Sequence, residues 1–302
     1  MSARPEDAGD GATLAGATVA VVGLGVVGGS LVRALAAMSG GPRVLGASPN
    51  AADRAGAERA GAARTAVEPA DLIAEAHVVV YAAPLSAILE MLPRHAALLR
   101  GDALVTDVGG LKAPVLAAAA AAGLRDRFVG SHPMAGGEGS GFEGGRADLF
   151  RGAPVHLCAD PAVDAARRAR AEALWRAVQA RPAWVDPAAH DRLMVRVSHL
   201  PQLVANALAL ALEDQNVSPA DLGPGGRDMT RLARSSPHMW TDLLAHTAGE
   251  AGALLRAVAE RLEDLADRLE RGDGVGVAEL MTRTRAWHGT PVDQAKDEEP
   301  GR

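Results

Sequence analysis

The sequence predicts an α/β domain with a parallel sheet, followed by an all-helical domain. Two patterns carry this prediction. From residue 18 onward, short runs rich in β-branched residues alternate with longer helical stretches, which is typical of a parallel sheet covered by helices. After about Pro187 the strand signal stops, and apolar residues recur at helical spacings of three and four.

The predicted sheet domain alternates strands with helices along the chain. Strands are expected at residues 18–22, 43–47, 77–81, 103–108, 128–131 and 155–158, with a weaker one at 183–186. Helices are expected at residues 28–37, 50–60, 85–99, 113–122 and 163–180. We therefore place the sheet domain at residues 16–187 and the helical domain at 188–289, with disordered tails at 1–15 and 290–302.

The helical domain contains apolar stripes that can pack against other helices. A helix over residues 199–212 carries apolar residues on one face, and a later helix begins at Ser236-Pro237, a cap residue followed by proline. A third stripe contains Leu255, Val258, Leu262, Leu265 and Leu269. The third stripe is typical of ordinary helix packing and also compatible with a helical homodimer interface.

Composition excludes several classes of function. The 302 residues carry a formal net charge of −6 and no Lys/Arg run, so we expect no nucleic-acid partner and no membrane partner. A single cysteine, Cys158, excludes an internal disulfide, and the histidines are too scattered to predict a metal site. Residues 1–11 are polar, and the longest aliphatic stretch, 203–212, is far shorter than the ~20 residues of a membrane span. We expect a cytoplasmic protein.

A glycine-rich turn follows the first predicted strand. Its sequence is Gly23-Leu24-Gly25-Val26-Val27-Gly28, the G-x-G-x-x-G pattern set between a strand and a helix. In such a turn the first glycine permits the tight bend, the second lets a pyrophosphate approach the backbone, and the third lets the helix pack on the strand. These six residues are therefore expected to bind a dinucleotide in a Rossmann-type domain.

The second strand bears on which dinucleotide is bound. NAD sites usually carry an acidic residue at its end, but here the strand ends in Ser48. A serine can hydrogen-bond a 2′-phosphate, and Arg54 lies close enough to add positive charge, which together favour NADP slightly. Pro49 stands where a phosphate-binding arginine often follows, so an NAD enzyme with other contacts remains the alternative.

A histidine follows the fifth predicted strand. His132 lies within the block from Gly130 to Gly141, at the carboxyl end of a strand, where open α/β sheets bind ligands. A neutral imidazole takes a proton near neutral pH, as the removal of hydride from an alcohol requires. His132 is therefore the candidate catalytic base.

These motifs together resemble one known family, the prephenate and arogenate dehydrogenases of tyrosine biosynthesis. The resemblance runs from about residue 17 to 288 and rests on ordered motifs: Val22 to Ser30, Asp107 to Lys112, the His132 block, His190-Asp191-Arg192, Val197 to Pro201, and Gly226 to Arg231. It implies a Rossmann domain followed by an all-α helical dimerisation domain. It also implies NAD(P)-dependent oxidative decarboxylation of prephenate to 4-hydroxyphenylpyruvate in a homodimer.

The resemblance implies roles for individual residues. His132 matches the histidine that draws off the proton of the substrate ring hydroxyl, and Arg231 matches the arginine that binds a substrate carboxylate. Arg227 matches a basic position that reaches across the dimer. Further expected contacts are His199, Gln202 and Ser131 for the substrate, and Ala83, Pro84 and Asp107 for the cofactor.

The chain departs from the family pattern at two positions. The family motif D-x-x-S-x-K has a serine that orients the substrate hydroxyl and the histidine, but this chain has Gly110 there. Water, Ser131 or Ser140 could substitute, or turnover could be slower. Many prephenate-using members carry a second histidine in S-H-L-P-H, where this chain has Gln202, which both donates and accepts hydrogen bonds.

Three alternatives to a prephenate dehydrogenase stay open at this stage. Gln202 could accept the amino group of arogenate, which makes an arogenate dehydrogenase the first alternative. A related enzyme with a Rossmann domain and a helical dimer, such as a 3-hydroxyacid dehydrogenase or an imine reductase, would leave the His132 block unexplained. A noncatalytic dinucleotide-binding dimer is supported only by Gly110. The sequence leaves NAD versus NADP and inhibition by tyrosine open.

Overall fold

The sheet of this protein has the strand order β3-β2-β1-β4-β5-β6-β7-β8 in a computed structural model that describes residues 14–137 and 139–289. The strands are β1 (Thr18–Val22), β2 (Arg43–Ala47), β3 (Arg64–Ala66), β4 (Val78–Tyr81), β5 (Leu104–Asp107), β6 (Phe128–Pro133), β7 (Pro154–Ala159) and β8 (Arg181–Trp184). The order reverses between β1 and β4, which is the place where doubly wound sheets bind dinucleotides. This confirms the predicted Rossmann-type domain.

The sheet is not wholly parallel, so the prediction was wrong for its last two strands. β7 runs antiparallel to β6, and β8 is parallel to β7. The connection from β6 to β7 contains only the short 3-10 turn Phe142–Gly144. A parallel pair needs a crossover, usually a helix, and none lies here to carry the chain back. The short elements β3 and α3 (Ala70–Ile73) were missed because they hold too few residues to show a period.

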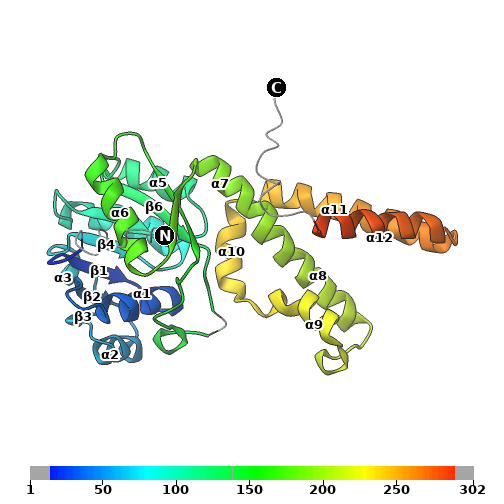
Figure 1. The fold of residues 1–302 in the computed structure, drawn as a ribbon, viewed down its shortest axis with the longest axis horizontal. Coiled ribbons are helices and arrows are strands. Elements are labelled where there is room, and N and C mark those ends of the chain that lie inside the picture. The colour runs from blue at the N-terminus through cyan, green and yellow to red at the C-terminus, as the bar shows by residue number, and fades with distance from the viewer. Residues whose placement is uncertain (1–13, 138, 290–302) are drawn as a thin grey trace, which may run out of the picture. The chain divides into compact units, whose positions relative to one another are not determined.

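Helices bury the sheet on both faces, as Figure 1 shows for the left half of the picture. They are α1 (Val26–Ala36), α2 (Ala51–Arg59), α4 (Leu85–His95), α5 (Ala113–Ala121) and α6 (Ala165–Ala177). One apolar core joins α1 and α6 to the sheet through residues such as Leu31 and Trp175. A second core joins α4 and α5 to the opposite face through residues such as Ile88 and Val115. Both faces are apolar because a mostly parallel sheet is covered on both sides.

Beyond β8, the rest of the first unit is helical. It contains α7 (Pro187–Met194), the π-type turn Val195–His199, α8 (Leu200–Asp214), α9 (Pro224–Thr230), the 3-10 turn Arg231–Arg234 and α10 (Pro237–Ala245). α7 and α8 continue through the π-type turn as one helical run over Pro187–Asp214, which by length and composition alone could cross a membrane. The aliphatic stretch 203–212 noted in the sequence is the last part of this longer helical run. Helices in the cores of soluble proteins can be equally long and apolar.

The described residues form two compact units, which divide between Ala248 and Gly249. The predicted boundary near residue 187 falls inside the first unit and stays a prediction. The described part of the second unit consists of α11 (Ala248–Glu270) and α12 (Gly274–His288). The predicted tail at 290–302 lies outside the described residues, as does the predicted tail at 1–15 up to residue 13.

Several large apolar side chains of the second unit have no cover within the described chain. Those that are 61% to 79% exposed are Leu262, Leu269, Val275, Met281 and Trp287. Exposed apolar side chains in such numbers on two helices are typical of a surface that another molecule covers.

Candidate active site

The glycine turn between β1 and α1 has the shape that a dinucleotide needs. Gly23 has a φ of 100°, and a Cβ there would lie 2.2 Å from the carbonyl oxygen of Ala82. A Cβ at Gly28 would lie 2.0 Å from the carbonyl oxygen of Gly23, so both positions require glycine. A Cβ at Gly25 would meet nothing within 4 Å. The open space lies where α1 begins, and a helix N-terminus attracts an anion such as a pyrophosphate.

The end of β2 carries an acidic partner that sequence reasoning missed. Ser48 is buried, and its Oγ donates to Oδ2 of Asp53 at 3.3 Å. Arg54 Nη1 donates to the carbonyl oxygens of Ser48 and Pro49, at 2.7 and 3.0 Å. Asp53 therefore brings a carboxylate to the place where β2 supplies none. Its position in the first turn after the Asn50 cap was the available signal.

The glycine-rich loop after β6 folds back onto the cofactor side of the sheet. Phe142 is buried between α1 and α2, where a Cβ at Gly29 or Gly56 would lie 2.9 or 2.5 Å from its ring. The backbone N–H of Phe142 donates to Oδ1 of Asp53 at 2.8 Å. The two glycines and Asp53 thus hold the loop that begins at the candidate catalytic histidine.

His132 is half-buried at the carboxyl end of β6 and belongs to a chain of hydrogen bonds. Its Nδ1 lies 2.9 Å from Nε2 of His190, and Nδ1 of His190 lies 2.7 Å from Oδ1 of Asp191. Both partners come from α7, and His190 is buried. The Asp191 carboxylate also accepts from the backbone N–H groups of Lys112 and Ala113, at 2.7 and 2.8 Å. The sequence marked the His190-Asp191 pair as a motif but gave it no role.

Burial and nearby positive charge keep His132 neutral. Burial, followed by the charge of Lys112, lowers the pKa of His132 well below 6.5. His190, His156 and His199 add smaller contributions in the same direction. A histidine with a lowered pKa is unprotonated at neutral pH and can accept a proton. Among the described residues, no three His, Cys, Asp or Glu side chains are placed to hold a metal ion.

Asp107 was expected to contact the cofactor, and this role stays a prediction. Its side chain is fully buried and forms an ion pair with Lys112 Nζ, which is fully buried as well. The carboxylate also accepts from the backbone N–H groups of Gly109 and Ser131. With both oxygens bound inside the protein, Asp107 supports the strand end that carries His132.

Ser131 was expected to contact the substrate, and this role also stays a prediction. Neighbouring residues of a strand point to opposite faces of the sheet, so Ser131 faces away from His132. Its Oγ lies 2.7 Å from Oγ1 of Thr106 and accepts from Nε1 of Trp175 at 3.0 Å, in the core under α6. It therefore does not replace the family serine at Gly110.

Two further predicted substrate residues lie in the interior of the helical segment. His199 is 2% exposed, with Nδ1 3.1 Å from Oγ1 of Thr247. Gln202 is also 2% exposed, and its Nε2 donates to the carbonyl oxygen of Leu232 at 2.7 Å. Oε1 of Gln202 is buried and has no hydrogen-bond partner. A buried acceptor without a partner is costly, so this oxygen favours a ligand that donates a hydrogen bond.

Ala83 and Pro84 lie at the end of β4, directly before α4. Ala83 is partly buried, and Pro84 is exposed. The first turn of α4 is joined to α10, because the N–H of Ser86 donates to Oδ2 of Asp242 at 2.9 Å. Gly110 lies on the same side, where a Cβ would be 3.4 Å from Leu243 of α10.

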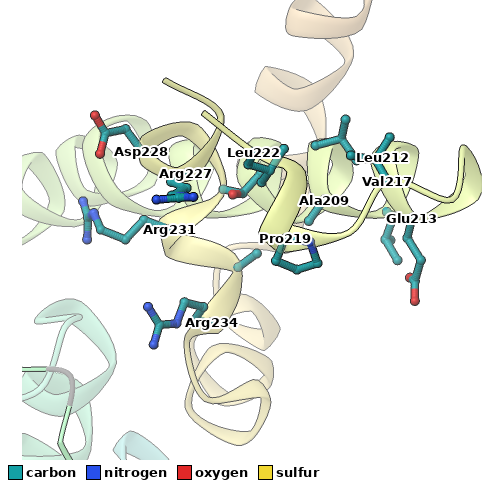
Figure 2. A pocket seen from close by; sticks show the side chains of 13 residues that line it. Ala209, Leu212, Glu213, Val217, Pro219, Leu222, Arg227, Asp228, Arg231 and Arg234 are labelled. Carbon is teal, nitrogen blue, oxygen red and sulfur yellow. The ribbon is translucent and has the colours of Figure 1, made fainter. Parts of the chain in front are cut away.

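Arg231 and Arg227 line a different cavity from the His132 group. This pocket has a volume of about 640 Å³ and is formed by α8, α9 and the turns beside them. Figure 2 shows Arg227, Arg231 and Arg234 projecting toward one side of the view, with the apolar residues Leu212 and Val217 on the other. Three guanidinium groups beside an apolar wall suit an anion with an apolar body.

Comparison with known proteins identifies the family. Residues 31–183 match the model "Prephenate dehydrogenase, nucleotide-binding domain", and residues 186–283 match "Prephenate dehydrogenase, dimerization domain". A prephenate dehydrogenase of Bacillus subtilis is 31% identical over 76% of this chain, which spans 64% of that relative's length. A cyclohexadienyl dehydrogenase of Zymomonas mobilis is 30% identical over 82% of this chain and 85% of its own.

A solved structure agrees with these matches. The crystal structure of the Aquifex aeolicus prephenate dehydrogenase, in complex with hydroxyphenyl propionate and NAD+, has a TM-score of 0.81 and 26% sequence identity. It covers 90% of this chain and 97% of its own length. On both family models and these relatives, the chain belongs to the prephenate dehydrogenase family.

Proposed function

We propose that this protein is an NAD-dependent prephenate dehydrogenase that converts prephenate to 4-hydroxyphenylpyruvate in tyrosine biosynthesis. The observation that carries the proposal is the placement of His132. Its imidazole stands at the carboxyl end of β6 with Nδ1 already bound by His190, which leaves Nε2 to face the substrate. The names of the Bacillus subtilis and Lactococcus lactis relatives support the same activity.

In the proposed reaction, Nε2 of His132 takes the proton of the ring hydroxyl of prephenate. Bound NAD supplies the hydride acceptor, and the ring carboxylate leaves as carbon dioxide while the ring becomes aromatic. The chain's own task is to position the ring and remove one proton, because aromatisation drives the rest. We assign to Arg231, with Arg227 beside it, the binding of a substrate carboxylate through the two-pronged guanidinium, although within one chain both line a cavity apart from His132.

A second substrate, arogenate, is favoured by one observation. Oε1 of Gln202 is buried without a hydrogen-bond partner, so it can accept from a donor on the substrate. The ammonium group of arogenate is such a donor, while the keto group of prephenate is not. The Zymomonas mobilis relative, named as a cyclohexadienyl dehydrogenase, supports this second activity.

The preference for NAD rests on Asp53. Ser48 alone favours NADP slightly, but the Asp53 carboxylate lies 3.3 Å from its hydroxyl. A carboxylate accepts hydrogen bonds from ribose hydroxyls and repels a 2′-phosphate. Arg54 is engaged by two backbone carbonyl oxygens on the other side of Ser48. The NAD+ in the Aquifex aeolicus complex supports this choice.

We also propose a cytoplasmic homodimer built through residues 186–283. The matching family model describes a dimerization domain, and α11 and α12 expose large apolar side chains that a second copy can cover. The same family model includes the whole apolar run 187–214, so we assign its exposed apolar surface to the partner subunit and not to a lipid bilayer.

The test is a steady-state matrix of prephenate and arogenate against NAD and NADP, followed by reduced-cofactor absorbance and carbon dioxide release. We expect turnover with prephenate and NAD, weaker turnover with NADP, and measurable turnover with arogenate. No turnover with either substrate, in a protein that still binds NAD, would support a noncatalytic dinucleotide-binding dimer.

A further inference from the structure

The hydrogen-bond chain from His132 to Asp191 contains more than a candidate base. Nδ1 of His132 lies 2.9 Å from Nε2 of His190, and Nδ1 of His190 lies 2.7 Å from a carboxylate oxygen of Asp191. His190, in the middle, is buried, and it is not part of the chemistry proposed above. Its two ring nitrogens are both engaged, one by each neighbour.

The Asp191 carboxylate determines which ring nitrogen of His190 and of His132 carries a proton. Asp191 accepts from two backbone N–H groups at the start of α5, which hold it in the ionised, acceptor-only form. Those hydrogen bonds and the one with His190 lower the pKa of Asp191, although its burial acts in the opposite direction. Nδ1 of His190 must therefore carry the proton that Asp191 accepts. When His190 carries only that proton, its Nε2 is an acceptor, and Nδ1–H of His132 donates to it.

We propose that His190 and Asp191 are positioning residues that fix His132 as the tautomer with its proton on Nδ1 and its lone pair on Nε2, facing the substrate. The inference rests on the proposed function, since it assigns His132 the role of base. It explains how His132 is oriented although Gly110 lacks the hydroxyl that the family pattern places there. The second imidazole holds the ring from behind, on the side away from the substrate.

The same hydrogen bonds also stabilise the positive charge that forms on His132. When Nε2 accepts the substrate proton, His132 becomes a cation whose Nδ1–H still donates to His190. His190 in turn donates to the Asp191 carboxylate, so the new charge is stabilised through two short hydrogen bonds. Without that support, the buried Lys112 ammonium and the burial of His132 both oppose protonation.

Other titratable groups lie near these three residues but are not part of their hydrogen-bond chain. The ring of His156 on β7 lies 5.3 Å from that of His190, but Nδ1 of His156 is buried and has no hydrogen-bond partner. Lys112 is bound to Asp107 and to the carbonyl oxygen of Ser131, and His199 is bound to Thr247. His156 is therefore the matched control, as a neighbouring imidazole outside the hydrogen-bond chain.

The first experiment measures the tautomer directly. Long-range ¹H–¹⁵N NMR on the full chain labelled with ¹⁵N-histidine distinguishes a proton on Nδ1 from one on Nε2. We expect His132, assigned from the loss of its signals in His132→Asn, to carry its proton on Nδ1. In Asp191→Asn the side chain is uncharged and has one acceptor atom in place of two, while two backbone N–H groups still face it, so the preference of the His132 proton for Nδ1 should weaken. A proton on Nε2 of His132 in the unchanged protein would overturn the proposal.

The second experiment separates positioning from folding. His190→Asn keeps a side-chain amide beside Asp191, and so keeps the cap of α5, but removes the atom that contacts His132. We expect kcat to fall about 10²–10⁴-fold, as for loss of a general base. The KM values for prephenate and NAD should stay within about threefold, since the proposal gives His190 no contact with either ligand.

Controls keep the two proposals apart. His156→Asn should lower kcat far less than His190→Asn does, because His156 lies outside the hydrogen-bond chain, and the thermal unfolding of all variants shows whether they fold. A folded His190→Asn variant with unchanged kcat would overturn the positioning role. If the unchanged protein does not turn over either substrate, the proposed function fails, but the NMR measurement still decides the tautomer.

Discussion

Lys112 and Asp107 form an ion pair in which neither side chain is exposed to solvent. The pair lies at the carboxyl end of β5, and Lys112 Nζ also donates to the carbonyl oxygen of Ser131, next to His132. The two charges thus tie the strand end that carries the candidate base to the start of α5. They stabilise the site only as a pair, because a single buried charge is expensive.

Lys112→Met should destabilise the protein strongly. It leaves the Asp107 carboxylate buried without its counter-charge, which costs about 3–5 kcal/mol in comparable buried pairs. The free energy of unfolding from denaturant titration measures the loss. The double variant Asp107→Asn/Lys112→Met should recover part of it, because an amide carries no charge. A loss below about 1 kcal/mol in the single variant would contradict this account.

The pH dependence of turnover should report a histidine that stays neutral in mild acid. Burial and the Lys112 charge lower the pKa of His132, and the base is active only when neutral. Activity is therefore present above the lowered pKa and is lost only as the pH falls through it. The acid limb of kcat/KM for prephenate should lie below pH 6.5, the ordinary histidine pKa. A limb at or above that value would contradict the assignment of His132 as the base.

Gly110→Ser should be tolerated and should change turnover little. Its Cβ would lie 3.4 Å from Leu243, which is ordinary van der Waals contact. If His190 already orients His132, the added hydroxyl should alter kcat less than about tenfold, an effect of under ~1.4 kcal/mol. Gly110→Ala separates the Cβ from the hydroxyl. A gain of several hundredfold in Gly110→Ser alone would instead favour an enzyme decayed by loss of the serine.

Asp53→Asn should shift the cofactor preference toward NADP. It removes a negative charge beside Ser48, where the 2′-phosphate would lie, while its amide oxygen can still accept from Phe142. We expect the ratio of kcat/KM for NADP over NAD to rise about tenfold, a modest share of the energy of two close charges. Asp71→Asn, an exposed acidic residue on α3, is the control and should leave the ratio unchanged.

Gly25→Ala should weaken NAD binding, whereas Gly28→Ala should lower the stability of the fold. A Cβ at Gly25 meets nothing within 4 Å, so stability should change by less than about 0.5 kcal/mol while the KM for NAD rises. A Cβ at Gly28 would lie 2.0 Å from the carbonyl oxygen of Gly23, so this variant should lose about 1–3 kcal/mol of stability. Denaturant titration and NAD titration measure the two effects. Equal stability loss in both variants would contradict the open space at Gly25.

The features predictable from the sequence were those that neighbouring residues determine. The glycine turn, most strand positions and the placement of His132 at a strand end all follow from short local patterns, and the structure reproduces them. The direction of the Ser131 side chain away from His132 also follows from a local pattern, because adjacent residues of a strand face opposite sides of the sheet.

The features that could not be predicted depend on residues far apart in the chain. His132 meets His190 across 58 positions, and Asp53 meets the N–H of Phe142 across 89. No local pattern contains such a pair, because it arises only after the sheet forms and brings α7 beside β6. The antiparallel direction of β7 could not be predicted for the same reason, since the length of the connection from β6 does not determine the direction of the next strand.

The hydrogen-bond chain also limits how freely this enzyme can be recombined with its relatives. His132 lies in the segment that matches the nucleotide-binding family model, while His190 and Asp191 lie in the segment that matches the dimerization model. The two segments are therefore not interchangeable modules. A chimaera that takes its helical half from a donor lacking this His-Asp pair would inherit a complete cofactor site and an unsupported base. Successful grafts must carry α7 together with β6.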